Sequence, residues 1–298
     1  PILVHRDAME ASAKTTIQWL QLNPADTALA CLPVNYIAGA MVIVRALVGD
    51  LTVCLVEPSM NPLAEIPPMS IQLTSFVPNQ WYSILDSSVD LDNYFSKCKG
   101  ILLGGGSLSA GLLQRTKSLP YPIFETYGMT ETVSHVAYKK PNEQFFQLFS
   151  SVDFDLDNRD CLRLKGAVTN HKWIQTNDIV SLQEGRKFEY VGRFDRVINS
   201  AGRKIHPEKL ENFISSMVEP GIEFFIHSIP DELLVNKACL FYTGDFNQKD
   251  QTTLLSYMRS KFEPWELPKQ IIQLPIFQFT STGKIDRLKS VALYLKSK

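Results

Sequence analysis

Strand-like runs alternate with helical patterns between Thr27 and Gly128, and this alternation constrains the fold more than any other feature of the chain. Each strand-like run, such as TALACLPV or KGILLGGGS, is followed by a helical pattern, such as AGAMVIVRALVGD or SAGLLQRTKSL. Strands separated by helices are typical of a parallel sheet whose faces the helices cover. The sequence therefore predicts an α/β fold with parallel sheets and flanking helices.

The pattern changes after about Ser151. Short strands then alternate with turns, which predicts a small antiparallel β-barrel or meander region. Beyond Asp195 the residues predict a small α+β domain, with helices at PEKLENFISSM and QTTLLSYMRSKF and strands at HSIPDE and ACLFYTG. The length of 298 residues also exceeds that of a typical single domain. We expect an N-terminal domain at residues 1–194 and a C-terminal domain at residues 195–298.

Composition narrows the possible partners and location. Thirty Lys and Arg residues against 31 Asp and Glu residues give a net charge of −1, so no bulk charge would attract nucleic acid or an anionic membrane. The five cysteines are scattered and form no C-x-x-C pair, which argues against a disulfide framework and a zinc site. No secretory signal is visible. These features favour a cytoplasmic protein without nucleic-acid or membrane partners, and they leave a homo-oligomer open.

The most apolar run is LACLPVNYIAGAMVIVRALV. It contains Pro33, Asn35 and Arg45, so we interpret it as a buried strand followed by a helix and not as a membrane span.

Two segments mark a ligand site at the carboxyl ends of predicted strands, where parallel sheets bind ligands. They are the glycines Gly104, Gly105 and Gly106, and the motif YGMTET, each placed just after a predicted strand. The glycines are not a dinucleotide fingerprint, because Ser109 stands where the third glycine belongs, and STGK lacks the first glycine and the final Ser or Thr of a Walker loop. Consecutive glycines let the backbone approach a flat ligand, although a plain flexible loop is the alternative.

The chain resembles the acyl-adenylate-forming superfamily, which includes acyl-CoA ligases, luciferases and peptide-synthetase adenylation domains. Five segments in the family's order carry the resemblance: LPVNYIAG, GGGSLSAG, YGMTET, TNDIV with GRFDRVINSAGRKIHPEKLE, and TSTGKIDR. The resemblance implies that a carboxylate attacks the α-phosphorus of ATP to give acyl-AMP and pyrophosphate, and that the acyl group then passes to a thiol. ATP, Mg²⁺ and coenzyme A are the ligands expected.

The resemblance also implies roles for YGMTET. Tyr127 would offer a flat face to adenine, and Gly128 would let the backbone turn sharply beside it. Thr130 would donate its hydroxyl to a phosphate oxygen, and Glu131 would supply the hard oxygen ligand that magnesium prefers. The alternative is a strand end with solvent-facing Thr and Glu. His135, a lone histidine in an apolar strand, is interpreted as a packed structural residue.

Three residues of the central segment match ribose-binding and hinge positions of the family. Asp178 and Arg193 would bind the ribose hydroxyls, although an ordinary surface charge pair is the alternative. Asp195 would be the hinge at which a mobile C-terminal lid domain rotates.

Lys284 in TSTGKIDR matches the lysine that bridges the substrate carboxylate and the α-phosphate. Its positive charge would lie where negative charge develops, although an ordinary turn lysine is the alternative. After rotation of the lid, the loop containing Ser200, Ala201 and Gly202 would line the channel for the pantetheine arm of coenzyme A. The reaction would thus require two conformations.

The segment SFVPNQWYSIL resembles the Val-Pro-Thr-Gln region of o-succinylbenzoate–CoA ligases, a subgroup that also has TNDIV. This resemblance implies conversion of o-succinylbenzoate to its CoA thioester, a step of menaquinone synthesis. Tyr36, Ser75 and Pro78 are the expected acyl-pocket residues, and Tyr36 stands where many relatives carry histidine.

One departure from the family concerns the start of the chain. The family's phosphate loop should lie just upstream of ILVHRDAM, and the chain begins at Pro1 without an initiator methionine, so we expect missing upstream residues. The alternatives that stay open are an adenylation enzyme that loads a carrier protein and a nucleotide-binding module without catalysis. A hydride-transferring Rossmann enzyme is the weakest alternative.

Overall fold

The computed structural model describes residues 2–218, 222–280 and 284–296. The chain divides into two compact units. Unit 1 comprises Pro1–Leu108, Leu112–Thr176 and Val180–Tyr190, and unit 2 comprises Ser109–Gly111, Asn177–Ile179 and Val191–Lys298. The predicted rotation at Asp195 stays a prediction.

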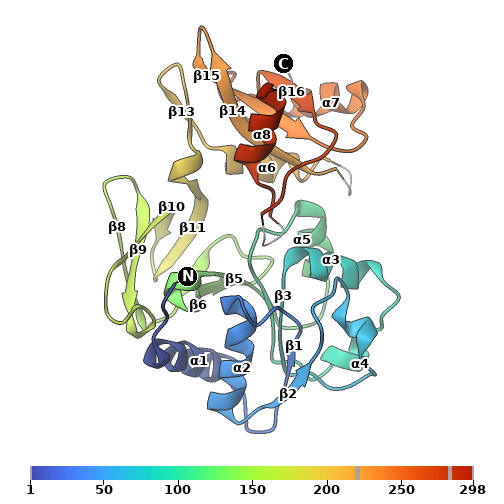
Figure 1. Cartoon of the computed structure of the whole chain (residues 1–298), viewed down its shortest axis with the longest axis vertical. Helices are drawn as coiled ribbons and strands as arrows, with labels where there is room; N and C mark the ends of the chain where they lie inside the picture. The colour runs from blue at the N-terminus through green and yellow to red at the C-terminus, as the bar shows by residue number, and fades with distance from the viewer. Residues whose placement is uncertain (1, 219–221, 281–283, 297–298) are drawn as a thin grey trace. The chain divides into compact units, whose positions relative to one another are not determined.

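The strands that the structure describes up to Arg193 belong to one sheet of eleven strands (Figure 1). Its strands are, in spatial order, β2 (Thr52–Leu55), β1 (Thr27–Ala30), β3 (Leu73–Phe76), β4 (Gly100–Leu103), β5 (Ile123–Met129), β6 (Ser134–Lys139), β7 (Phe146–Leu148), β11 (Lys187–Arg193), β10 (Ile174–Gln183), β9 (Cys161–Gly166) and β8 (Val152–Leu156). The helices that accompany it are α1 (Arg6–Leu20), α2 (Ile37–Gly49), α3 (Pro78–Asp86), α4 (Asp92–Phe95) and α5 (Ala110–Lys117).

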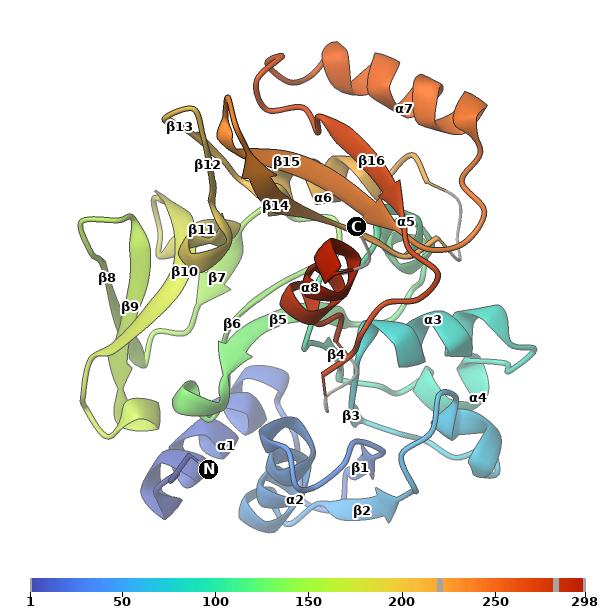
Figure 2. The same cartoon turned by 45° about the horizontal axis from the view of Figure 1, so that its top comes forward.

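The first five strands in this order are parallel, as the sequence predicts. Because successive side chains of a strand point to opposite faces, β1 contributes Leu29 to one core and Ala28 and Ala30 to another. Residues of α3, α4 and α5 pack on the Leu29 face, and residues of α1 and α2 pack on the opposite face. Figure 2 shows α1 and α2 side by side. The predicted α/β fold with flanking helices is confirmed.

The antiparallel half of the sheet begins at β6, which runs antiparallel to β5. The strand pairs β6 with β7, β7 with β11 and β8 with β9 are antiparallel too. The predicted meander is therefore present, and the pairing of Lys187 with Gln147 joins it to the main sheet. Its own core contains Val136, Leu162 and Phe188.

Unit 2 contains the small α+β fold that the sequence predicts. Its elements are β12 (Ile198–Ser200), β13 (Arg203–Ile205), α6 (Pro207–Ile214), β14 (Phe224–Asp231), β15 (Val235–Tyr242), α7 (Gln248–Arg259), β16 (Gln270–Gln273) and α8 (Arg287–Lys296). Strand β15 pairs antiparallel with β14 and parallel with β16. One face of this sheet packs against residues of α6 and α7, and the other packs against Val291 of α8.

The apolar run that contains Arg45 folds as predicted, with β1 followed by helix α2. Among the helices that the structure describes, none is both long enough and apolar enough to cross a membrane. Arg45 itself is buried with 1% exposure.

Candidate functional site

The carboxyl ends of the parallel strands bring several predicted site residues of unit 1 to one edge of the sheet. Phe76, the last residue of β3, pairs with Leu103, the last residue of β4, and Leu103 pairs with Glu125 of β5. The segments that follow these residues therefore emerge together. They carry Pro78, the three glycines and YGMTET.

Two of the three glycines are required by the local geometry. A Cβ atom on Gly104 would lie 2.7 Å from Thr126 Oγ1, and Gly105 has a φ of +83°, which side-chain-bearing residues rarely adopt. A Cβ atom on Gly106 would lie 3.7 Å from Pro78 Cγ, which is an ordinary contact. The loop after β4 thus presents bare backbone at the edge where YGMTET ends.

The predicted acyl-pocket residues lie on three neighbouring segments of this edge. Ser75 is half-buried in β3, and its carbonyl accepts a hydrogen bond from Cys31 Sγ at 3.6 Å. Pro78 begins α3 beside Gly106. Tyr36 precedes the first residue of α2 and is 40% exposed. Their contact with an acyl group stays a prediction.

YGMTET lies partly inside a strand, so its predicted place just after the strand is wrong. Strand β5 continues through Tyr127 and Gly128 to Met129, because β6 supplies hydrogen-bonding partners for these residues. The Tyr127 ring packs edge-on against Phe188, with the ring centroids 5.1 Å apart. The register shifts between Tyr127 and Gly128, and a Cβ atom on Gly128 would lie 2.0 Å from Ser134 O. Only glycine fits this bulge.

The TET part of the motif forms a short 3₁₀ turn, Thr130–Thr132. Thr132 is buried, and its hydroxyl accepts a hydrogen bond from the Met129 amide at 3.0 Å and contacts Ser134 O at 2.9 Å. These bonds hold the turn from inside, while Thr130 is half-buried and Glu131 is exposed. A hydroxyl donor and a carboxylate are thus presented on an anchored turn.

The residues present fit magnesium only in one binding mode. The described part of the chain contains no group of three or more His, Cys, Asp or Glu side chains that could hold a metal ion. Magnesium bound to a nucleotide takes one or two carboxylates, phosphate oxygens and water. The exposed carboxylate of Glu131 suits that mode.

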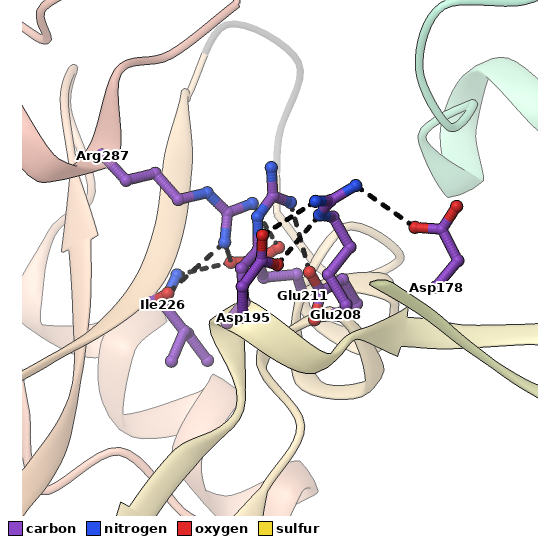
Figure 3. A network of polar contacts seen from close by, with 8 residues as sticks. Asp178, Asp195, Glu208, Glu211, Ile226 and Arg287 are labelled. Carbon is purple, nitrogen blue, oxygen red and sulfur yellow. Dashed lines mark hydrogen bonds and ion pairs between the residues drawn. The ribbon is translucent and has the colours of Figure 1, made fainter. Parts of the chain in front are cut away.

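Unit 2 brings Asp178, Arg193 and Asp195 together (Figure 3). Arg193 donates from Nη1 to Asp178 Oδ1 at 3.3 Å, and from Nε and Nη2 to the two oxygens of Asp195 at 2.9 and 2.8 Å. The hydrogen bonds from Arg193 hold the pKa of the Asp195 carboxyl below its usual value. Asp178 and Arg193, the predicted ribose-binding pair, are therefore in contact. Asp195, the predicted hinge residue, bonds to the same arginine.

Lys284 lies near two arginines of unit 2. Desolvation lowers the pKa of its ammonium group, and the positive charges of Arg196 and Arg193 lower it further. The Lys284 carbonyl accepts a hydrogen bond from the Thr280 amide at 2.8 Å. The preceding residues of the predicted loop, Ser281, Thr282 and Gly283, lie outside the described residues.

The predicted coenzyme A segment forms a tight hairpin turn between β12 and β13. Ala201 and Gly202 have φ values of 47° and 79°, as a two-residue hairpin turn with both central residues left-handed requires. Both are exposed, whereas Ser200 is buried with 6% exposure. The turn can therefore present backbone to a ligand, but the Ser200 side chain points into the unit.

Two charged side chains, Arg196 and Arg45, were not predicted from the sequence as functional residues. Arg196 donates from Nη1 to Glu208 Oε1 at 3.2 Å, and the second oxygen of Glu208 lies against Gly192, whose Cβ would be 2.8 Å away (Figure 3). Arg196 lies within GRFDR and could have been noticed as a second arginine beside Arg193. Arg45 was interpreted only as an argument against a membrane span, although a charge inside an apolar helix is itself a signal of a buried polar contact.

The chain is similar in sequence and in fold to known proteins. A family model described as AMP-binding enzyme matches residues 2–160, just over half of the chain. A 2-succinylbenzoate–CoA ligase from Staphylococcus epidermidis is 28% identical over 309 residues, which cover 94% of this chain and 64% of that protein. The chain thus spans less than two thirds of that relative's length.

Two solved structures are similar to the chain. An acyl-CoA synthetase (AMP-forming)/AMP-acid ligase II-like protein from Dyadobacter fermentans is 35% identical, with a TM-score of 0.63 over 98% of this chain and 85% of that one. The o-succinylbenzoate CoA synthetase from Bacillus subtilis, in complex with its acyl-adenylate intermediate, has a TM-score of 0.83 at 19% identity, over 97% of this chain and 66% of that one. The second likeness shows the fold.

Proposed function

This chain belongs to the AMP-binding enzyme family, and from that premise we propose that it activates a carboxylic acid with ATP and transfers the acyl group to coenzyme A. One observation carries the proposal. Asp178 and Arg193 lie on neighbouring strands and Lys284 comes much later in the sequence, yet all three belong to one unit, where Arg193 bonds to Asp178 and its charge acts on Lys284. A carboxylate for ribose hydroxyls beside cations for phosphate suits a nucleotide.

Unit 2 carries the residues that we propose for the ribose and the α-phosphate. Asp178 accepts hydrogen bonds, and Arg193 donates them, so the pair can bind ribose hydroxyls from both sides. The pKa of Lys284 is lowered partly because Arg193 and Arg196 repel its charge. An anionic phosphate placed among these cations would relieve that repulsion. The charge that develops as the carboxylate attacks the α-phosphorus would be stabilised in the same way.

Unit 1 carries the residues that we propose for adenine and the outer phosphates. Tyr127 offers a partly buried ring for adenine, and the backbone of Gly104, Gly105 and Gly106 allows close approach of the nucleotide. Thr130 donates its hydroxyl to a phosphate oxygen. Glu131 would hold magnesium, which when bound supplies positive charge to the phosphates and to the departing pyrophosphate.

We propose o-succinylbenzoate as the acid. The relative from Staphylococcus epidermidis is a 2-succinylbenzoate–CoA ligase, and the segment around Ser75 and Pro78 resembles the same subgroup. Coenzyme A would then release AMP by attacking the acyl-adenylate, with the turn at Ala201 and Gly202 beside its pantetheine arm. The hinge at Asp195, the cytoplasmic location, the oligomeric state and the absence of nucleic-acid and membrane partners stay predictions.

Exchange of labelled pyrophosphate into ATP tests the proposal on the intact protein. We expect o-succinylbenzoate to stimulate the exchange, and benzoates, fatty acids and amino acids to leave it near background. Addition of free coenzyme A should then yield the thioester. Exchange with another acid would refute the substrate and keep the adenylation chemistry. Exchange with no acid would refute the enzymatic proposal and favour a nucleotide-binding module without catalysis.

Replacing Glu131 with glutamine tests the magnesium contact. The amide has the shape of the carboxylate but lacks its charge, so we expect the Mg²⁺ concentration for half-maximal exchange to rise about tenfold and the exchange rate to fall about 10²-fold. Glu184→Gln is the matched control, since Glu184 is exposed on the turn between β10 and β11. An unchanged Mg²⁺ dependence in the Glu131 variant would remove Glu131 from the metal site.

A further inference from the structure

Two consecutive residues directly after the TET turn adopt the left-handed conformation. Val133 has a φ of 51° and Ser134 a φ of 82°. Such values are unfavourable for residues other than glycine, and a β-branched residue such as Val133 rarely adopts them. A conformation of this kind persists only where surrounding contacts impose it, and it is concentrated at functional sites. The contacts that hold these two residues therefore also hold the turn.

Helices α1 and α2 supply those contacts. Ser12 of α1 donates its hydroxyl to Val133 O at 2.7 Å. Arg45 of α2 donates from Nη2 to Ser134 Oγ at 3.1 Å and from Nε to Thr16 Oγ1 at 3.1 Å. A third contact of Arg45, from Nη2, is with His135 Nδ1 at 3.4 Å. The guanidinium group thus ties α1 to both residues that begin β6.

Burial of the Arg45 side chain at this position costs free energy. Its side chain is 1% exposed, and among the residues that the structure describes no carboxylate forms an ion pair with it. Burial lowers the pKa of the guanidinium group to about 10. A buried charge without a counter-charge costs free energy that an apolar side chain of similar size would avoid. An apolar side chain would fill the core at this position equally well. The hydrogen bonds of Arg45 to Thr16 and Ser134 are what an apolar residue could not provide.

We propose that Arg45 is a positioning residue, which fixes the left-handed pair Val133–Ser134 and thereby holds Thr130 and Glu131 in the geometry that binds the phosphates and magnesium of ATP. This inference rests on the proposed function, since it names Mg·ATP as the ligand. Ser134 is the link between Arg45 and the turn, because its hydroxyl accepts from Arg45 and its carbonyl contacts Thr132 Oγ1 at 2.9 Å.

Two variants of the intact protein separate positioning from bulk stability. Arg45→Met removes the donors and keeps an apolar side chain in the core, and Ser134→Ala removes only the acceptor hydroxyl. Tyr94→Phe is the control, because it removes buried hydrogen bonds to Leu63 O and Ile66 O on the opposite face of the sheet.

The first measurement is hydrogen exchange of the Val133 amide, which donates to Thr130 O at 3.1 Å across the turn. We expect exchange about tenfold faster in both Arg45→Met and Ser134→Ala, and unchanged exchange in Tyr94→Phe. The second measurement is the dissociation constant of Mg·ATP. It should rise about tenfold in the two variants, since small displacements of binding groups are costly, while the dissociation constant of magnesium-free AMP should change less than about twofold.

Each outcome decides between the alternatives. Faster exchange together with a selective loss of Mg·ATP affinity supports the proposal. Unchanged exchange in a folded Ser134→Ala variant overturns it, whether or not the protein binds ATP. Equal losses of Mg·ATP and AMP affinity would also overturn it, because they indicate general damage. If the wild-type protein binds no Mg·ATP, the proposed function fails and the ligand named in this inference fails with it, while faster exchange would still support the role of Arg45 in holding the turn.

Discussion

Replacing Lys284 with alanine is expected to lower the rate of acyl-adenylate formation by about 10³-fold, which is the scale of loss when a group that stabilises developing charge is removed. The charges of Arg196 and Arg193 in unit 2 act on Lys284 and lower the pKa of its ammonium group. Its removal takes away one of the charges that would face the α-phosphate as the carboxylate attacks. The arginines would remain, and Arg193 would still bond to Asp178, so we expect the affinity for ATP to change much less than the rate.

Pyrophosphate exchange measures this loss, and a second assay gives the prediction its selectivity. Thioester formation from a supplied acyl-adenylate and coenzyme A should stay near the wild-type rate in Lys284→Ala, because no phosphoryl chemistry is left for Lys284 to assist. Lys289→Ala is the control, since Lys289 is an exposed lysine on α8 that pairs with Asp286. Exchange at the wild-type rate in Lys284→Ala, or an equal loss in both half-reactions, would contradict the assigned role.

Replacing Gly128 with alanine is expected to lower the free energy of unfolding by about 3 kcal/mol and to disrupt the turn that carries Glu131. The new Cβ would lie 2.0 Å from Ser134 O and 2.6 Å from His135 Cα, both of them backbone atoms of β6. A side chain could rotate away from such a clash, but a paired strand cannot. The bulge between β5 and β6 would have to open, which would displace Ser134 from Arg45.

Denaturant unfolding followed by circular dichroism measures the loss of stability. Gly111→Ala is the matched control, because among the described residues no atom beyond its chain neighbours and its own helix backbone lies within 4 Å of the Cβ position, and the residue belongs to helix α5. Alanine is a better helix former than glycine, so this control should be neutral or slightly stabilising. Equal midpoints for the two variants would show that β6 accommodates the methyl group, and that the glycine is not required by packing.

The helices that the sequence analysis did not predict show where periodic patterns fail. The buried face of α1 consists of Ala8, Ser12, Ala13, Thr16 and Leu20. Their spacing is helical, but small and hydroxyl-bearing residues give a weak hydrophobic pattern. Two of them satisfy their hydroxyls inside the fold, because Ser12 forms a hydrogen bond with Val133 O and Thr16 contacts His135 Nε2. Helix α8 was missed for a similar reason, since its buried residues are only Ser290 and Val291.

The segments of the candidate site could be predicted from the sequence, but the contacts between their residues in space could not. YGMTET, the glycine loop and Lys284 were identified because their residue types occur in a known order. That Arg193 contacts Asp178 and Asp195 at once, and that Lys284 lies near Arg193 and Arg196, depends on the packing of unit 2. Residues 178 and 193 belong to neighbouring strands of the sheet, while residue 284 reaches the same unit from beyond α7 and β16.

By itself, the sequence determined most of the strands and helices, because alternation along a strand and periodicity along a helix are local properties that each segment carries. The order of its motifs determined the family. Only the tertiary structure decided that the meander continues the main sheet through β7 and β11, and that Arg45 bonds to Ser134, 89 residues further along the chain. The physical reason is that a buried charge and an unpaired strand edge must find polar partners wherever the fold brings them. Those partners are set by three-dimensional packing, to which no local pattern in the chain corresponds.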